Sequence, residues 1–368
     1  MNLKDMGWTP FFEAAFTSTS EHLVPARVVC REKASYRVWC ETGYLKATVC
    51  GRMRHKSTRQ ADLPTTGDWV VIDNSPGEAL GITRERIPRK TELSRKAPIS
   101  GGRKIGTVGD QEMIVGGRTE EQILAANVDF VFHTASLLSE ANLRMIDRVS
   151  VSCQVAGIGL VLLLNKADAV DPSQIALQSV EIERTFPETP CHVVSGYTGL
   201  GLDELRHYLK RGVTVCLTGQ SGVGKSTLIN RFLGTEQLAT GPVREGDNKG
   251  RHITTRRELI CLPDGGIVID NPGIREFQIW STVSDVERNF EQIAELSSIC
   301  RFSDCSHTQE PGCEVLAALE DGRLQKERYE SFVKLQNDAL YLLSRKKGLT
   351  KREKLKWKKL AKRKNIKF

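Results

Sequence analysis

One glycine-rich stretch constrains the fold more than any other part of this sequence. It reads Gly219-Gln220-Ser221-Gly222-Val223-Gly224-Lys225-Ser226-Thr227 and has the spacing G-x-x-x-x-G-K-[ST]. A β-branched apolar run over 213–218 precedes it and predicts a buried strand. Apolar residues at helical spacing over 226–233 follow it and end at Gly234. Strand, glycine loop and helix N-terminus together cradle phosphate, so the stretch predicts a nucleoside triphosphate site.

The residues of this phosphate loop have distinct expected roles. Backbone N–H groups between Gly219 and Thr227 would turn inward around the phosphates. Lys225 would reach the β- and γ-phosphates and contribute to catalysis, and the Ser226 hydroxyl would bind Mg²⁺. The alternative is a glycine-rich turn that happens to contain a lysine, which the flanking strand and helix disfavour.

The tetrapeptide Asn165-Lys166-Ala167-Asp168 indicates which base is bound. It follows an apolar run over 157–164 that is typical of a parallel strand. The Asp168 carboxylate can accept hydrogen bonds from guanine N1–H and the 2-amino group, which adenine lacks, a difference of about 1–3 kcal/mol or more. The Lys166 stem would cover the base, and Asn165 would tether the loop. Alone the pattern is weak, because Asp168 could cap a turn, but beside a phosphate loop it favours guanine.

A third loop begins at Ser195 and Gly196, directly after the short apolar run 191–194. Its backbone N–H is expected to meet guanine O6. The alternative is an ordinary turn from strand to helix, since Leu202 to Leu205 resembles a helix start.

The residues after the phosphate loop have the features of a nucleotide switch. The range 241–257 is polar and charged and contains Thr254 and Thr255, either of which can bind Mg²⁺ and sense the γ-phosphate. A strand over 266–269 then ends in Asp-x-Pro-Gly. Asp270 would hold the Mg²⁺ shell, and the Gly273 N–H would touch the γ-phosphate.

The order of these motifs predicts a rearranged domain. A standard small GTPase has the phosphate loop first and Asn-Lys-x-Asp last, whereas here the base-recognition motifs precede the phosphate loop. Permutation moves the termini of a domain without moving its contacts. We therefore expect an α/β P-loop GTPase fold in a circularly permuted chain.

Charge is distributed unevenly along the chain of 368 residues. The tail from Ser344 to Phe368 has thirteen Lys or Arg residues against Glu353 alone, a net charge of +12 in a chain whose total is +8, so the rest has −4. A mildly acidic body with a basic tail is typical of a protein that binds a polyanion at one end. No membrane span or signal layout is apparent, and no disulfide framework is indicated, so we expect a cytoplasmic protein. No feature suggests an obligate dimer, and a monomer is expected.

The N-terminal part, from about Ala26 to Glu92, is expected to be all-β. Four short β-rich runs, at 26–30, 35–40, 44–49 and 68–72, are separated by turn residues and predict a small barrel or sandwich. A charged loop lies between the last two runs, and its basic residues are Arg52, Arg54, His55, Lys56 and Arg59. This loop is either an oligonucleotide contact or simply a charged loop on a spacer.

Three cysteines and a histidine near the C-terminus suggest a metal centre. Cys300, Cys305, His307 and Cys313 have the spacing C-x₄-C-x-H-x₅-C. Three thiolates and an imidazole suit a closed tetrahedral Zn²⁺ site, which would be structural because no position stays open. The alternative is a set of free thiols in a loop. A packed helix is expected from about Leu324 to Leu343, and the tail after it is an RNA arm, a membrane-surface helix or a solubilising tail, of which we favour RNA.

Taken together, these motifs resemble those of the circularly permuted, small-ribosomal-subunit-dependent GTPases, the RsgA or YjeQ family. The resemblance spans nearly the whole chain, from the Gly67-Asp68-Trp69-Val70 turn through the permuted GTPase motifs to the Cys/His segment. It implies an OB-fold barrel, one structural Zn²⁺, and GTP/GDP with Mg²⁺. It also implies binding to the small ribosomal subunit and its rRNA, with subunit-stimulated GTP hydrolysis late in assembly.

The expected domains follow from the motifs and the resemblance. They are an N-terminal extension (1–25), an OB-fold barrel (26–93), a linker or exposed basic loop (94–121), a circularly permuted GTPase domain (122–281), a zinc-binding, mainly helical domain (282–343) and a basic tail (344–368).

The residue that positions the attacking water cannot be the one that Ras-like proteins use. Ile274 occupies the position where Ras-like proteins carry a water-positioning Gln, and a hydrophobic residue there is what the resemblance implies. His252, just before the switch threonines, is a candidate replacement, although it could instead contact rRNA phosphate. Because Ile253 follows the His, Thr254 and Thr255 both stay open as the Mg²⁺ ligand, and we favour Thr255.

Two other functions compete with a subunit-stimulated GTPase. The first is an RNA-binding module that uses GTP only as an affinity switch. The second is a P-loop ATPase or kinase, which Asp168 disfavours.

Overall fold

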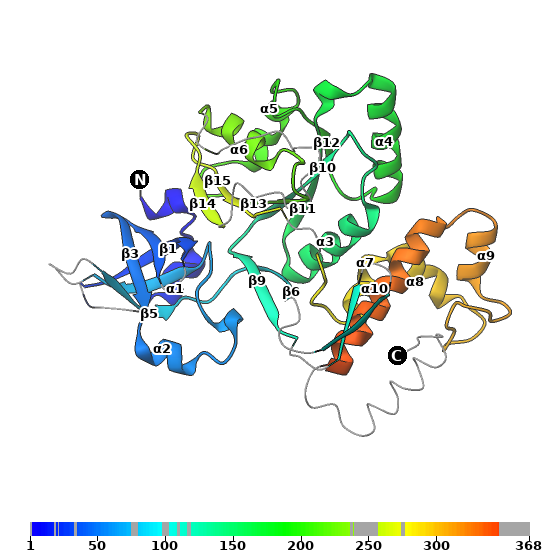
Figure 1. The fold of residues 1–368 in the computed structure, drawn as a ribbon, viewed down its shortest axis with the longest axis horizontal. Helices are drawn as coiled ribbons and strands as arrows, with labels where there is room; N and C mark the ends of the chain where they lie inside the picture. Colours follow the sequence, from blue (N-terminus) through cyan, green and yellow to red (C-terminus); the bar gives the residue numbers. More distant parts are fainter. Residues whose placement is uncertain are drawn as a thin grey trace. The chain divides into compact units, whose positions relative to one another are not determined.

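A computed structural model describes residues 2–17, 20, 22–32, 35–74, 80–97, 103–108, 111–115, 119–235, 238, 257–273 and 277–345. The chain forms two compact units (Figure 1). The first consists of Met1–Ser94, Gln122–Leu143 and Ala156–Glu276, and the second of Arg95–Glu121, Arg144–Val155 and Phe277–Phe368. The expected barrel and most of the expected GTPase domain therefore belong to one unit.

A mostly parallel sheet forms the GTPase part of the first unit. From one edge to the other its strands are β12 (Cys191–Val193), β11 (Gly159–Asn165), β10 (Phe130–Ser136), β13 (Thr214–Gly219), β15 (Ile267–Asp270) and β14 (Glu258–Cys261). All neighbours are parallel except β14 and β15, which are antiparallel. The phosphate-loop strand β13 lies inside the sheet, flanked by strands that precede it in the chain on one side and by strands that follow it on the other. This arrangement confirms the permuted α/β fold.

Helices complete this domain and position the motifs. They are α4 (Pro172–Thr185), α5 (Leu202–Leu205) and α6 (Lys225–Leu233), with short 3₁₀ turns η3 (Ala167–Ala169) and η4 (Arg206–Tyr208). Nearly all of α3 (Leu143–Ala156) belongs to the second unit. Helix α6 buries Leu228 and Ile229 in the core beneath the sheet. It ends at Gly234, whose φ of 68° is left-handed, so the apolar spacing and the terminating glycine predicted this helix correctly.

Five strands form the N-terminal barrel. They are β1 (Leu23–Arg31), β2 (Tyr36–Cys40), β3 (Gly43–Val49), β4 (Trp69–Asp73) and β5 (Gly81–Arg86). Around the ring the strands pair in the order β1, β2, β3, β5 and β4, and β4 pairs with β1, which closes the barrel. The sequence predicted the barrel but missed β5, because most of its residues are polar. The basic residues expected in a loop instead form helix α2 (Gly51–Lys56), followed by η2 (Gln60–Asp62).

The barrel is joined to the GTPase sheet by backbone pairing and by one buried arginine. Strand β1 pairs with β14 at Cys30 and Glu258. The Arg27 side chain is only 1% exposed, and its guanidinium donates to the carbonyl oxygens of Met6, Gly67 and Asn127 and to Thr214 Oγ1. Burial lowers the pKa of Arg27 to about 10, although Asp129 opposes this shift.

The expected extension 1–25 is packed against the barrel. It contains η1 (Leu3–Met6) and α1 (Pro10–Ala15). Trp8 lies edge-on against Trp69 at 4.7 Å between ring centroids, and Phe12 contacts the same ring at 5.9 Å. Because these rings are buried, this segment contributes to the core of the first unit.

The second unit is mainly helical. Its helices are α7 (Val283–Asn289), α8 (Glu291–Ser298), α9 (Glu314–Glu320) and α10 (Lys326–Arg345), and residues 144–155 of α3 belong with them. Buried Asp147 of α3 accepts hydrogen bonds from Arg328 and Ser331 of α10. The expected range 122–281 is thus divided between the two units.

The range 94–121, which we expected to be a linker or exposed loop, contains strands. It includes the end of β6 (Glu92–Lys96), the antiparallel pair β7 (Arg103–Val108) and β8 (Gln111–Val115), and the start of β9 (Glu121–Ala126). Its Gly, Arg and Lys content hid these strands, because they have few apolar anchors. The described parts of this range therefore have more regular structure than we expected.

All ten cysteines are free thiols. Among the helices that the structure describes, none combines the length and apolar composition needed to cross a bilayer.

Candidate functional site

The phosphate loop lies between β13 and α6, as its sequence predicted. Gly224 caps α6 with a left-handed φ of 97°, and a Cβ at this position would collide with the Asn165 side-chain nitrogen. Ser226 and Thr227 are partly buried in the first turn of α6. Glycine is therefore required where this helix starts, and the helix N-terminus stays open toward the loop.

Lys225 is folded back over its own loop. Its side chain is 7% exposed, and Nζ donates to the carbonyl oxygens of Gly219 at 3.0 Å and Gln220 at 2.8 Å. Burial lowers the pKa of Lys225 to about 8, and Asp270 opposes the shift. The ammonium is thus held at the loop by two neutral acceptors, which phosphate oxygens can replace with stronger charge-assisted bonds.

Asp270 ends β15 beside this lysine and is 2% exposed. Both of its carboxylate oxygens are buried without a hydrogen-bond partner among the described residues. Burial raises the pKa of Asp270 to about 6, although Lys225 opposes the shift. An unpaired buried carboxylate is costly, and a hard divalent cation that prefers oxygen ligands is the partner it lacks. The residues present therefore fit Mg²⁺.

Gly273 brings the Asp-x-Pro-Gly loop onto the phosphate loop. A Cβ on Gly273 would lie 2.7 Å from Ser221 Cα and 2.8 Å from Ser221 N. The neighbours are backbone atoms, so a side chain could be accepted only if one loop moved.

We expect Gly273→Ala to slow GTP hydrolysis by about tenfold, since a shift of about 1 Å in a positioning group costs a factor of this order or more. Single-turnover phosphate release measures the effect. Gly51→Ala is the matched control, because a Cβ on Gly51 meets no atom within 4 Å. Equal rates for the two variants would show that the tight approach at Ser221 has no role in turnover.

Asn165 connects the two predicted base-recognition loops to the phosphate loop. Its Nδ2 donates to the Val223 carbonyl at 2.8 Å, and its Oδ1 accepts from the Gly196 N–H at 3.0 Å. The side chain is 2% exposed. One buried amide therefore brings together three motifs that are separate in the sequence, as a tether would.

Asp168 and Ser195 lie side by side at the carboxyl ends of neighbouring strands. The Ser195 hydroxyl donates to Asp168 Oδ1 and accepts from the Thr198 N–H at 3.0 Å. Asp168 is exposed, and Lys166 beside it has a left-handed φ of 71°. We had expected only the backbone of the Ser195 loop to contribute. The signal that was overlooked is a hydroxyl residue at the end of a parallel strand next to the Asp168 strand, since such ends meet at one sheet edge.

Other predicted site residues lie outside the described residues. These are His252, Thr254, Thr255 and Ile274. Their roles stay predictions.

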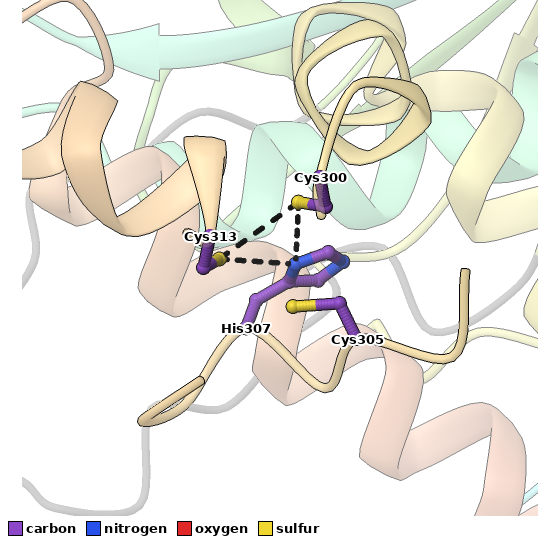
Figure 2. A group of neighbouring side chains, drawn as sticks. All are labelled: Cys300, Cys305, His307 and Cys313. Carbon is purple, nitrogen blue, oxygen red and sulfur yellow. Dashed lines mark hydrogen bonds between the residues drawn. The ribbon is translucent and has the colours of Figure 1, made fainter. Parts of the chain in front are cut away.

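The four predicted zinc ligands converge in the second unit (Figure 2). Their ligand atoms all lie within 4.8 Å of one another. Cys300 Sγ is 3.9 Å from Cys313 Sγ, and His307 Nδ1 is 3.7 Å and 3.4 Å from these two sulfurs. A tetrahedral Zn²⁺ with bonds of about 2.0–2.3 Å separates its ligands by about 3.3–3.8 Å. The geometry therefore fits a closed zinc site.

Residues that sequence reasoning missed hold the histidine in place. Ser297 Oγ lies 3.0 Å from His307 Nε2, and the Tyr329 hydroxyl donates to the His307 carbonyl at 2.5 Å. Glu310 accepts hydrogen bonds from three backbone N–H groups between Ser306 and Gln309. Such contacts orient a metal-binding imidazole and fix its tautomer.

Two protein-family profiles match the chain. One, described as RsgA GTPase, matches residues 109–280. The other, described as 50S ribosome-binding GTPase, matches residues 214–360 and so begins at β13. It omits the base-recognition strands β11 and β12, which precede the phosphate loop in this chain.

Relatives match over nearly the full length. The small ribosomal subunit biogenesis GTPase RsgA of Opitutus terrae is 39% identical, covering 98% of this chain and 96% of its own. The protein of that name from Methanosarcina acetivorans is 36% identical, with 96% and 90% covered. YjeQ from Thermotoga maritima superposes with a TM-score of 0.59 at 26% identity, covering 86% of this chain and 99% of its own. YloQ, described as a circularly permuted GTPase, has the same fold at a TM-score of 0.58 and 20% identity, with 91% and 100% covered. The chain belongs to the RsgA family of circularly permuted GTPases.

Proposed function

We propose that this GTPase binds the small ribosomal subunit and hydrolyses GTP to GDP and phosphate when the subunit stimulates it, as a late assembly factor. The observation that carries the proposal is the convergence of three nucleotide motifs on Asn165, with Asp270 beside Lys225 and without a hydrogen-bond partner in the described part of the chain. Relatives covering nearly the whole chain are named small ribosomal subunit biogenesis GTPase. Together these support both the reaction and its partner.

In this proposal the protein acts by positioning and by charge. Asp168 selects guanine, with Ser195 holding one carboxylate oxygen, and the loop at Gly196 faces guanine O6. Bound Mg²⁺, held by Ser226, Asp270 and Thr255, would neutralise phosphate charge. Lys225 leaves its two carbonyl acceptors to bind the β- and γ-phosphates, and the Gly273 N–H donates to the γ-phosphate.

The attacking water needs a residue to orient it, and His252 is the candidate for this role. A near-neutral imidazole can hold a water and accept its proton. Slow turnover in isolation and faster turnover on the subunit would follow if the subunit orders this part of the switch.

The barrel offers a surface for rRNA. Helix α2 presents exposed Arg52, Arg54, His55 and Lys56, with exposed Arg59 just beyond it. Phosphate attraction requires only such clustered positive charge. The basic tail, which lies outside the described residues from position 346 on, would add a second contact. We further propose a cytoplasmic monomer, and its free thiols suit that reducing compartment.

Phosphate release from GTP and from ATP, with and without purified small subunits at two salt concentrations, tests the function. We expect GTP-selective turnover that rises with subunits and falls with salt. Flat, slow GTP hydrolysis alongside tight GTP binding would favour the affinity-switch alternative, and equal ATP turnover would contradict the role of Asp168.

Neutralising α2 tests the rRNA surface. Replacing Arg52, Arg54 and Lys56 together by Ala should weaken subunit binding by about tenfold or more. The plot of log affinity against log salt should also become less steep, its negative slope shrinking in magnitude by about two to three. Sedimentation with subunits at several salt concentrations measures both. Lys210→Ala, at an exposed lysine of the GTPase domain, is the control. An unchanged slope would place the RNA contact elsewhere.

A further inference from the structure

A row of paired residues runs from the barrel to the proposed magnesium site. Arg37 on β2 lies opposite Cys30 on β1. Cys30 lies opposite Glu258 on β14, and Glu258 lies opposite Asp270 on β15. Strand β14 is therefore where the barrel meets the strand that carries Asp270.

An ion pair connects β2 to β14 across the intervening strand β1. Arg37 Nη2 donates to Glu258 Oε1, and the two side chains are 44% and 42% exposed. Their strands are two apart, a span of about 10 Å that two long side chains can cover. Arg37 Nε is buried without a hydrogen-bond partner among the described residues. Glu258 is thus the ion-pair partner of this guanidinium, and the pair links the barrel to β14.

A second barrel contact lies at the start of the same strand. Thr66 Oγ1 donates to the Arg257 carbonyl at 3.4 Å, and the Thr66 carbonyl accepts from the Ala126 N–H at 3.0 Å. Arg257 is the last residue of the range whose sequence predicts the nucleotide switch. The barrel therefore holds the strand between that range and Asp270.

Glu258 is also the cross-strand neighbour of Asp270. Directly opposed residues on antiparallel strands share one face and interact. The Glu258 carboxylate is attached opposite Asp270 in this way. Arg37 balances that carboxylate from the barrel side.

We propose that Arg37 and Glu258 are positioning residues that couple the barrel to Asp270 through β14. When the subunit fixes the barrel, the ion pair fixes β14 and with it the cross-strand partner of the magnesium carboxylate. The inference rests on the proposed function, because it needs a subunit that stimulates turnover. It assigns no contact with nucleotide to either residue.

A charge-swap cycle tests the coupling. Arg37→Glu and Glu258→Arg should each lower the ratio of stimulated to basal turnover by about fivefold, and the double variant should restore most of it. Subunit affinity, measured by sedimentation, should stay within about twofold of wild type. Arg84→Glu and Asp73→Arg are the controls, since this 2.6 Å pair joins two strands within the barrel and should leave the ratio unchanged.

Release of fluorescent GDP at increasing Mg²⁺, without subunits, provides a readout independent of turnover. Positioning predicts that both single variants need about threefold more Mg²⁺ to slow release. A purely electrostatic effect predicts shifts in opposite directions, because the two substitutions change the charge near Asp270 with opposite sign, and that result would overturn the inference.

Other outcomes separate this inference from the function it rests on. If subunits stimulated the wild type and the variants equally, the inference alone would be overturned. A loss of stimulation that is explained by weaker subunit binding would make Arg37 an RNA contact and would also overturn the inference. Wild type that subunits fail to stimulate would overturn the proposed function and the inference together.

Discussion

Replacing Asp168 with asparagine is expected to change the base that this protein prefers. The carboxylate can accept two hydrogen bonds from guanine, whereas an amide offers one acceptor and one donor, and that donor would face the guanine 2-amino group. We expect GTP and GDP affinity to fall by about a hundredfold or more, since a buried donor left unpaired is heavily penalised. Xanthine has an oxygen at position 2, so xanthosine nucleotides should become the preferred ligands.

Competition of GDP and XDP against a fluorescent nucleotide measures this switch. Ser195→Ala is the informative control, because it removes the hydroxyl that donates to Asp168 Oδ1 but leaves the carboxylate. This variant should bind GDP about tenfold more weakly and should not bind XDP more tightly than the wild type does. If Asp168→Asn weakened both nucleotides equally, Asp168 would be capping its loop and would not be reading the base.

Removing one zinc ligand is expected to unfold part of the second unit. Structural zinc sites contribute about 10–16 kcal/mol of apparent binding energy at neutral pH, which is folding energy in so short a segment. Cys313 is buried at the start of α9 and packs in the core of α7 to α10. Cys313→Ser should therefore lose its zinc, shown by metal analysis, and should become sensitive to protease within residues 290–325.

Two further variants serve as a control and as a milder change at the zinc site. Cys153→Ser makes the same chemical change at a buried α3 cysteine of the same unit, away from the cluster, and should keep its zinc. Ser297→Ala should keep the site but bind zinc about tenfold more weakly in a chelator competition, because it frees the imidazole nitrogen that Ser297 holds. A wild-type protein whose stability is the same with and without metal would rule out a structural zinc.

The parts of the fold that were predicted from sequence are those whose signals are local. Gly224 and Gly234 have left-handed backbone conformations beside apolar helical spacing, so loop and helix could be recognised within one stretch. Strand β5 could not be recognised in this way. Its sequence runs Gly81-Ile82-Thr83-Arg84-Glu85-Arg86 and becomes a strand because β3 and β4 flank it.

The same distinction applies to the sites. The zinc ligands lie within one short segment, and their spacing alone suggested the metal. Arg27, in contrast, lies in an apolar run, and its partners at Met6, Gly67, Asn127 and Thr214 are 21 to 187 residues away. Three of those acceptors are backbone carbonyls, and because every residue has one, the sequence does not reveal which of them accept.

Arg27 has a consequence for dissecting the protein into pieces. One buried guanidinium on the barrel strand β1 donates to acceptors from the N-terminal segment, the barrel and the GTPase sheet. Losing the N-terminal segment or the sheet would therefore leave this buried charged group short of hydrogen-bond acceptors. The first unit should then melt in a single cooperative transition, and a fragment that starts at the barrel should be unstable. A barrel from a relative could be exchanged into this chain only together with its own N-terminal segment and with the residues that face Arg27.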